Sequence, residues 1–238
     1  MTGNVTGAVH YVLGVIVLEA GRPAEAETRL RRAAEAGNVG AARVLGPLLY
    51  DSGRIAEAEA LYRRAIENAE APEVMNDLGF VLHHSGRTEE AEHWWTRAAD
   101  AGIAVAMFNL GGLAEAAGSP ETAERWYRQA CQAGDKDAFL NLGVLLNKAG
   151  RTREAEQWYR RGAEAGETAC MVNLGSAMAR AGIEDEAERW WKRAAEAGDV
   201  KAMLNLSKML RRSGRRGGAA WWRQRAAEAA EKAETDQS

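Results

Sequence analysis

The fold is decided by the stretch DAFLNLGVLLNKAGRTREAEQWYRRGAEAG, which occupies residues 137–166. Its first part repeats apolar residues at helical spacing and predicts a helix over 137–148. Gly150 ends this helix, because glycine readily takes the left-handed cap conformation. Thr152 then begins a second helix, in which an early acidic residue favours the positive end of the helix dipole. We expect one side of the second helix to face inward, and the residues on that side are Ala155, Trp158, Tyr159 and Gly162.

Two small residues of this stretch are expected where the two helices cross. Gly143 lies in the first helix and Ala155 in the second. A large side chain at either position would hold the two backbones apart.

The same unit recurs along the whole chain. A Leu-Gly pair returns every 32 or 33 residues, a second glycine follows seven residues later, and an alanine follows five residues after that. The pairs are Leu13-Gly14, Leu45-Gly46, Leu78-Gly79, Leu110-Gly111, Leu142-Gly143 and Leu174-Gly175, and the seventh becomes Leu206-Ser207. We therefore predict a single repeat domain over residues 1–231 and a disordered tail over 232–238. The repeats span about 7–38, 39–71, 72–103, 104–135, 136–167, 168–199 and 200–231.

Composition excludes several classes of protein. The chain is 46% hydrophobic and 27% charged, so it can bury a core, and its net charge of -3 argues against a broadly basic nucleic-acid binder. The only cysteines, Cys131 and Cys170, exclude a disulfide framework and a four-cysteine zinc site, and we expect them in the core. No apolar run reaches about 18 residues, so we expect no membrane span. A reducing cytoplasm is the expected location, and the excess of Arg over Lys suggests a bacterial, GC-rich genome.

The repeated residues resemble the tetratricopeptide repeat over the whole chain. Asn141-Leu142-Gly143, Gly150, Ala155 and Tyr159 match its spacing, and the run at residues 187–198 resembles the related Sel1-like repeat. The proline between consecutive tetratricopeptide units survives only at Pro72, and the longer loop of Sel1-like units is absent, so the repeat is a short hybrid of the two. The resemblance implies an all-α, right-handed solenoid of about seven helix–turn–helix repeats.

The resemblance also implies where a ligand would bind. In tetratricopeptide superhelices the first helix of each repeat lines the concave groove. The residues that this geometry assigns to the groove are Tyr50, Phe80, Phe108, Asn109, Asn141, Asn173, Asn205, Lys201, Lys208, Arg211 and Arg212, with Arg215 and Arg216 in the turn that follows. The groove is thus expected to change from aromatic, through amide, to basic.

This gradient favours a protein or peptide partner. An asparagine side chain both donates and accepts hydrogen bonds, so a row of them could hold an extended backbone of any sequence. The Lys and Arg residues at one end could receive an acidic side chain or a terminal carboxylate. The alternative is that these asparagines satisfy local backbone groups or water, and they are also the family consensus.

The second helices carry charges and tryptophans with simpler interpretations. A Glu precedes an Arg or Lys by four residues at Glu27, Glu59, Glu124, Glu156 and Glu188, which is typical of an exposed helix stabilised by internal ion pairs. The aromatic pairs at 94–95, 126–127, 158–159, 190–191 and 221–222 favour core packing, with the first member of each pair half-exposed. Base or sugar stacking on these rings is the less favoured reading.

No catalytic signature is present. The sequence has no phosphate-binding loop, no dinucleotide fingerprint, no zinc-protease motif and no nucleophile elbow. The histidines His10, His83, His84 and His93 are expected in polar positions, without a metal. We predict a non-enzymatic scaffold that needs no cofactor and binds neither nucleic acid nor membrane. The alternative is a structural module that stacks through uncapped repeat ends.

Overall fold

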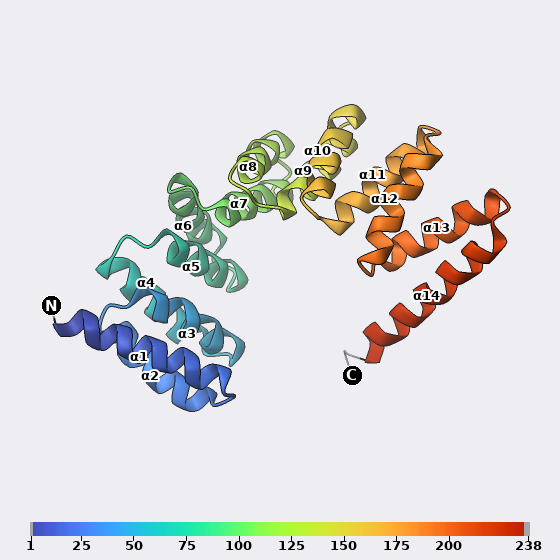
Figure 1. The fold of residues 1–238 in the computed structure, drawn as a ribbon. Helices are drawn as coiled ribbons and strands as arrows, with labels where there is room; N and C mark the ends of the chain where they lie inside the picture. The colour runs from blue at the N-terminus through green and yellow to red at the C-terminus, as the bar shows by residue number, and fades with distance from the viewer. Residues whose placement is uncertain (1, 236–238) are drawn as a thin grey trace. The chain divides into compact units, whose positions relative to one another are not determined.

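The part of the chain that the structure describes folds into helices joined by short turns, as the sequence predicts (Figure 1). The structure is a computed structural model that describes residues 2–235, and this range forms fourteen helices and no strand. The helices are α1 (Thr2–Glu19), α2 (Pro23–Glu35), α3 (Val39–Asp51), α4 (Ile55–Asn68), α5 (Pro72–His84), α6 (Thr88–Asp100), α7 (Ala104–Ala116), α8 (Pro120–Gln132), α9 (Asp137–Lys148), α10 (Thr152–Glu164), α11 (Thr168–Arg180), α12 (Glu184–Glu196), α13 (Val200–Arg212) and α14 (Arg216–Thr235).

Each predicted repeat is one pair of helices. In the fifth repeat, α9 and α10 begin where the sequence places them. Gly150 ends α9 with a φ of 77°, and its N–H donates to the carbonyl of Asn147 at 3.0 Å. The next N–H, of Arg151, donates to Leu146 at 2.9 Å, so two terminal carbonyls of α9 are satisfied. The all-α repeat architecture is confirmed.

The helix pairs form two compact units. The first unit comprises residues 1–133 and holds α1 to α8, and the second comprises 134–238 and holds α9 to α14. Within each unit the two helices of a pair pack together, and each second helix packs on the first helix of the next pair. First helices also lie beside one another, as α1, α3 and α5 do in the first unit and α9 and α11 in the second.

A leucine, a glycine and an aromatic ring build the core of a typical repeat. The leucines of five Leu-Gly pairs, from Leu45 to Leu174, and Leu206 of the Leu-Ser pair are at most 3% exposed. The following glycine lies against a ring sixteen residues later in the second helix: a Cβ on Gly111 would lie 2.6 Å from the ring of Tyr127. The same pairing joins Gly46 to Tyr62, Gly79 to Trp95, Gly143 to Tyr159 and Gly175 to Trp191. All five rings are buried, as predicted.

This packing differs from the expectation that Gly143 and Ala155 are small because two backbones cross there. Ala155 is buried, but the group that a side chain on Gly143 would strike is the ring of Tyr159. The glycine is therefore required by the ring and not by a close crossing of two backbones. Of the outer ring positions, Trp94, Trp126 and Trp190 are half-buried as expected, whereas Trp158 is buried. Both cysteines are buried.

The last helix is longer than predicted. α14 continues to Thr235, so residues 232–235 are helical although the sequence placed them in a disordered tail. Residues 236–238 lie outside the described residues. The extension follows from local sequence, because residues 226–235 are rich in Ala, Glu and Lys, which favour helix. Five earlier repeats end this helix at a turn glycine with positive φ, and the equivalent residue here is Ala230.

The second helices carry the predicted internal ion pairs only in part. Glu27–Arg31, Glu59–Arg63 and Glu124–Arg128 form with N–O distances of 2.8–2.9 Å. Arg160 instead reaches Glu186 of the next repeat at 3.4 Å, and Lys192 reaches Glu196 at 3.9 Å.

Several of these charges also join neighbouring repeats. Arg54, in the turn before α4, contacts Glu27 of α2 at 2.8 Å and Glu57 at 2.6 Å, and Arg31 of α2 reaches Glu57 at 3.2 Å. The hydrogen bonds from Arg54 and then Arg31 lower the pKa of Glu57 to about 2.

The arrangement of Arg54 recurs at other repeat junctions. Arg87 contacts Glu59 at 2.7 Å, and Arg215 contacts Glu188 through both of its terminal nitrogens. At two junctions the register places Ser119 and Ile183 where these arginines stand, so the same ion pair cannot form there.

Adjacent glycines in α7 provide a test of the ring contact. Gly111→Ala should lower the free energy of unfolding by about 1–3 kcal/mol, because the new methyl group strikes Tyr127. Gly112→Ala gains the same helix propensity, and its Cβ would lie 3.8 Å from the Tyr127 hydroxyl, so stability should rise by up to about 1 kcal/mol. Urea unfolding followed by circular dichroism measures both variants. Equal effects of the two substitutions would contradict the ring contact.

The junction ion pairs should make stability depend on pH. A carboxyl group whose folded pKa is lowered stabilises the fold above its unfolded pKa, and this contribution disappears as the pH falls through the folded value. Arg54→Gln should therefore lower the melting temperature at neutral pH and have little effect below about pH 2, where Glu57 is protonated. Arg22→Gln is the matched control, because Arg22 has the same register but, among the described residues, pairs only with Glu25 of the helix that follows it. Equal losses in both variants would show that the junction contact adds nothing.

Candidate functional site

The aromatic residues predicted for the groove come together in the first unit. Tyr50 of α3 and Phe80 of α5 meet edge to face with ring centroids 5.5 Å apart. His84, one turn beyond Phe80, lies 4.0 Å from the Phe80 ring and 6.2 Å from the Tyr50 ring. Phe80 is 42% exposed, so the cluster presents an apolar surface to solvent. The sequence indicated two of its members but gave His84 no specific role.

Phe108 does not join this cluster. It is half-buried and lies against Tyr127 of its own repeat, with ring centroids 5.8 Å apart. Its contact is therefore with the ring that packs on Gly111.

Asn109 belongs to a polar chain that crosses three first helices. Its Nδ2 donates to the side-chain oxygen of Asn76 at 3.2 Å, and Asn76 donates to Asp77 at 3.4 Å. Asp77 in turn lies 3.5 Å from Nε of Arg43 on α3. At this position the asparagine thus bonds to a side chain of the preceding repeat, and not to the local backbone group or water of the alternative interpretation.

Burial changes the acidity of Asp77. Desolvation raises its pKa, and the nearby Arg43 guanidinium opposes this effect without cancelling it. Asp77 has the register at which the four following repeats carry asparagine. An ionised carboxylate is therefore less favourable here than the amide found elsewhere in the array.

The asparagines of the second unit have different surroundings. Asn141, Asn173 and Asn205 are half-buried on α9, α11 and α13. Asn173 and Asn205 make no side-chain hydrogen bond to any part of the chain that the structure describes. Their amides therefore remain able to donate and accept.

The basic residues predicted on α13 are exposed. Lys201, Lys208, Arg211 and Arg212 form no ion pair within residues 2–235. Three of them share the helix face of Asn205 because of their spacing from it. Lys201 lies four residues before Asn205, Lys208 lies three after it and Arg212 lies seven after it. Arg215 differs, because its guanidinium is held by Glu188 of α12.

Two further cations were missed. Lys148 ends α9 and Arg180 ends α11, each seven residues after an asparagine, as Arg212 follows Asn205. Seven residues are two helical turns, so each first helix of this unit presents an amide and a cation on one face about 10 Å apart. The repeat register contained this signal: the same position is acidic in the first two repeats, as Glu19 and Asp51, and basic in the last three.

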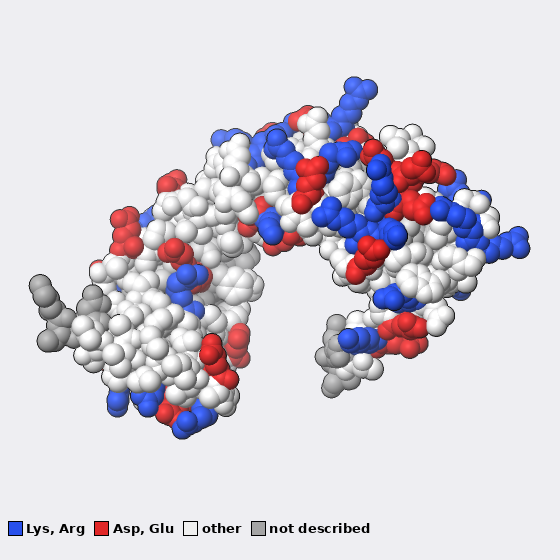
Figure 2. Space-filling view, viewed as in Figure 1, with Lys and Arg blue, Asp and Glu red and all other residues white. Residues whose placement is uncertain are grey.

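Figure 2 shows how charge is distributed on the visible surface. The area over α1 to α4 is mostly uncharged, whereas Lys, Arg, Asp and Glu gather over α10 to α12. Many of the second-helix arginines cover tryptophans. Arg97 lies 4.8 Å from the ring centre of Trp94, and Arg161 lies 4.7 Å from that of Trp158. These guanidinium groups occupy ring surface that stacking of a base or sugar would require.

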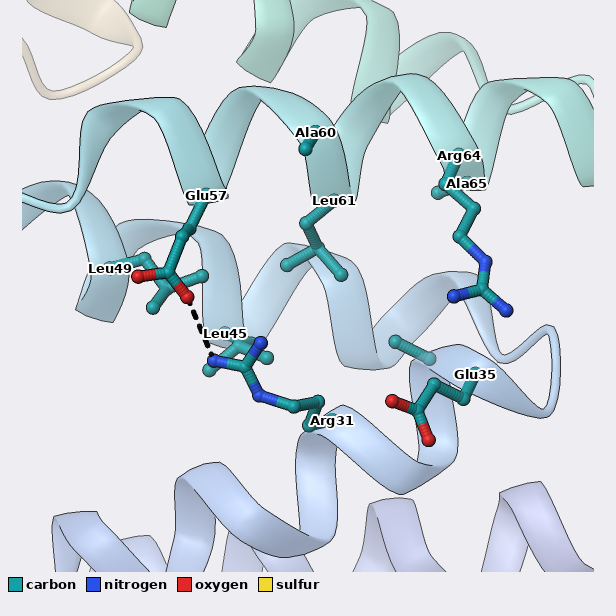
Figure 3. A pocket seen from close by; sticks show the side chains of 10 residues that line it. Arg31, Glu35, Leu45, Leu49, Glu57, Ala60, Leu61, Arg64 and Ala65 are labelled. Carbon is teal, nitrogen blue, oxygen red and sulfur yellow. Dashed lines mark hydrogen bonds and ion pairs between the residues drawn. The ribbon is translucent and has the colours of Figure 1, made fainter.

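Two crevices lie between the second helices of neighbouring repeats. One of about 200 Å³ lies between α2, α3 and α4 (Figure 3). Leu45, Leu49 and Leu61 supply its apolar lining, and the ion pair of Arg31 with Glu57 crosses its mouth.

A larger crevice, of about 370 Å³, lies between α10 and α12 at the same repeat register. Arg160 and Glu186 take the places of the Arg31–Glu57 pair, while Arg189 and Trp190 replace Ala60 and Leu61. Because the crevice recurs at the same register, it results from the way neighbouring repeats pack.

Two other features, a metal cluster and a membrane-spanning helix, are absent from the described residues. Residues 2–235 contain no group of three His, Cys, Asp or Glu side chains that could hold a metal ion. None of the described helices is both long and apolar enough to cross a membrane.

Helix pairs in constant register, with variable side chains on the first helices, define a class of α-helical repeat protein. The chain belongs to the tetratricopeptide repeat family, whose models match residues 7–32, 43–104, 85–138 and 137–167. No curated protein matches it in sequence.

Solved structures show the same architecture. A Sel1 repeat protein from Oxalobacter formigenes is 27% identical, with a TM-score of 0.72 over 92% of this chain and 99% of that protein. The pilF protein of Pseudomonas aeruginosa is 16% identical, with a TM-score of 0.64 over 79% of this chain and 90% of that one. YrrB, described as having an unusual peptide-binding site, is 22% identical, with a TM-score of 0.51 over 71% of this chain and 91% of its own. The tetratricopeptide and Sel1-like resemblance is thus confirmed.

The half-buried carboxyl group of Asp77 provides a test. Because folding raises the pKa of Asp77, ionisation of this group lowers stability as the pH rises through that range. Asp77→Asn should therefore raise the melting temperature at neutral pH, and the gain should vanish at a pH where both states are protonated. Asp51→Asn, at an exposed position of α3, should change little. A loss of stability in Asp77→Asn at neutral pH would mean that the ion pair with Arg43 outweighs desolvation.

Proposed function

We propose that the chain is a non-enzymatic scaffold whose second unit binds an extended protein segment along its first helices. The observation that carries this proposal is the paired amide and cation on α9, α11 and α13. The first-helix face is defined here as Asn141, Lys148, Asn173, Arg180, Asn205, Arg212, Lys201 and Lys208.

The amides suit a peptide backbone. Asn173 and Asn205 are half-buried and have no partner among the described residues, so a bound backbone could supply both a donor and an acceptor. Such contacts do not depend on the side chains of the ligand, and they favour an extended chain whose own amides are unpaired. The first unit lacks this arrangement, because Asn109 already donates to Asn76.

The cations add a preference for acidic groups. α13 alone presents four exposed basic residues that form no ion pair within residues 2–235. Hydrogen bonds between such cations and carboxylates are stronger than neutral ones. We therefore infer that the segment carries acidic side chains or ends in a carboxylate near α13. The fold is compatible with this role, since YrrB has a peptide-binding site on the same architecture.

A peptide library with free carboxyl termini tests the proposal directly. Peptides selected on the wild-type chain would be titrated by fluorescence anisotropy against a variant carrying Lys148→Gln, Arg180→Gln and Arg212→Gln. We expect affinity to fall at least about tenfold, because three charge-assisted contacts are lost. The wild-type affinity should also fall as salt is raised.

A matched control removes the same charge from the second helices. Arg153→Gln, Lys192→Gln and Arg223→Gln take one cation from each of α10, α12 and α14. This variant should bind within about twofold of the wild type. An equal loss of affinity in both triple variants would show that the interaction is only general charge attraction. Failure to select any peptide above background would refute peptide binding.

A further inference from the structure

The crevice between α2, α3 and α4 has a small apolar residue at its centre. Leu61 of α4 is half-buried and points into the crevice between Glu57 and Arg64 of the same helix (Figure 3). The spacing of positions 57, 61 and 64 places these three side chains on one face of α4. Arg31 and Glu35 of α2 lie on the opposite side (Figure 3). The centre of the crevice is thus apolar, and both of its ends are charged.

Repeat register shows that Leu61 stands where most second helices carry tryptophan. The first repeat has Arg29 at this position, and the five repeats after the second have Trp94, Trp126, Trp158, Trp190 and Trp222. All five of these indoles are buried or half-buried against their own repeats. Because a leucine is smaller than an indole, α4 leaves open a space that a ring occupies in every later repeat.

The crevice between α10 and α12 shows what the indole does. Trp190 takes the place of Leu61 there, and all the residues that line this crevice lie on the two second helices. In the crevice of the first unit the lining continues down to Leu45 and Leu49, which are buried on the first helix α3. Their equivalents on α11 are not part of the lining of the other crevice. The leucine on α4 therefore makes the crevice deeper and more apolar.

The arginine three residues after Leu61 has no ring to cover. In three later repeats the arginine at this register lies 4.7 to 5.6 Å from the ring centre of the indole, and these pairs are Arg97–Trp94, Arg161–Trp158 and Arg193–Trp190. Arg64 has the same register and is exposed, and it makes no ion pair or ring contact within residues 2–235. The face of an aromatic ring attracts a guanidinium group, so Arg64 is available to a ring that enters the crevice.

The size and charge of the crevice suit one neutral side chain. Its volume of about 200 Å³ is smaller than the roughly 300–1,000 Å³ of pockets that enclose whole small molecules. Pockets that hold a single aromatic anchor of a partner are typical of protein interfaces. Arg31 and Glu57 pair at 3.2 Å, so this end of the crevice carries no net charge.

We propose that this crevice binds an aromatic side chain, in the first place tryptophan, of a protein partner. In this arrangement the indole lies on Leu61 and beneath Arg64, and it completes from outside the packing that later repeats build from their own residues. The site lies on the second helices of the first unit, so it is separate from the first-helix face of the second unit.

Filling the crevice from within tests whether it accepts an indole. Leu61→Trp supplies the ring that later repeats carry, so the melting temperature should rise by about 2 °C or more, because the ring is buried and gains the contact with Arg64. The rise should be smaller when Arg64→Gln is also present. A melting temperature that falls in Leu61→Trp would overturn the proposal, because the crevice would then lack room for the ring.

Binding is measured by fluorine NMR with a blocked pentapeptide, Gly-Gly-Trp-Gly-Gly, whose tryptophan is fluorinated. The wild type should bind it saturably with a dissociation constant of about 1 mM, and Leu61→Trp should bind it at least about tenfold more weakly, because the crevice is already filled. Arg64→Gln should weaken binding by about two- to fivefold. Arg32→Gln is the matched control, since Arg32 is exposed at the same register of the first repeat, and it should bind as the wild type does.

Exchanging the two residues should move the site to the other unit. Leu61→Trp combined with Trp190→Leu closes the first crevice and opens the one between α10 and α12 beneath Arg193, so peptide binding should return. Trp94→Leu serves as a second exchange if circular dichroism shows that Trp190→Leu unfolds the chain. No binding by the wild type, equal binding by Leu61→Trp, or no return of binding in a folded exchange variant would each overturn the proposal. Tighter binding of free tryptophan than of the peptide would do the same, since it would identify a small-molecule site.

Discussion

The contact between a ring of the second helix and a glycine of the first is the constraint on which the repeat depends. The ring lies where a Cβ would be, so it sets how closely the two helices approach. This contact leaves the opposite side of each first helix free to vary. The terminal repeats depart from it: Leu30 takes the place of the ring beside Gly14, and Ser207 replaces the glycine and donates to the carbonyl of Ala219 at 2.8 Å.

Most of the fold could be predicted from the sequence because its signals are local and repeated seven times. The boundaries of α9 and α10, the cap at Gly150 and the burial of the rings follow from residues within one repeat. What could not be predicted depends on the distance between repeats. The contacts of Arg54 with Glu27 and of Asn109 with Asn76 join residues about one repeat apart, and register alone does not show which side chains reach across.

The residues of the candidate site that recur from repeat to repeat could be predicted, and those that do not recur could be predicted only in part. The asparagines and the cations of α13 were visible as a pattern, and comparison at one register would also have revealed Lys148 and Arg180. The aromatic cluster was only partly predictable, since Phe108 turns toward Tyr127 while His84 joins Phe80. Positions that every repeat shares build the fold. Positions that differ between repeats, such as the basic ends of the last three first helices, are those that can recognise something.

The uneven set of junction ion pairs has a consequence for cooperativity. In a linear array, the coupling between neighbours decides how far a local opening spreads. The junctions with Arg54, Arg87 and Arg215 carry an extra link between second helices, and the junction with Ile183 keeps a longer ion pair, Arg160 with Glu186 at 3.4 Å. At the junction with Ser119, between α6 and α8, the described residues form no ion pair between second helices. Transient opening of one repeat therefore stops most readily at this weaker junction. Hydrogen exchange would report the repeats on either side of it as a step in protection.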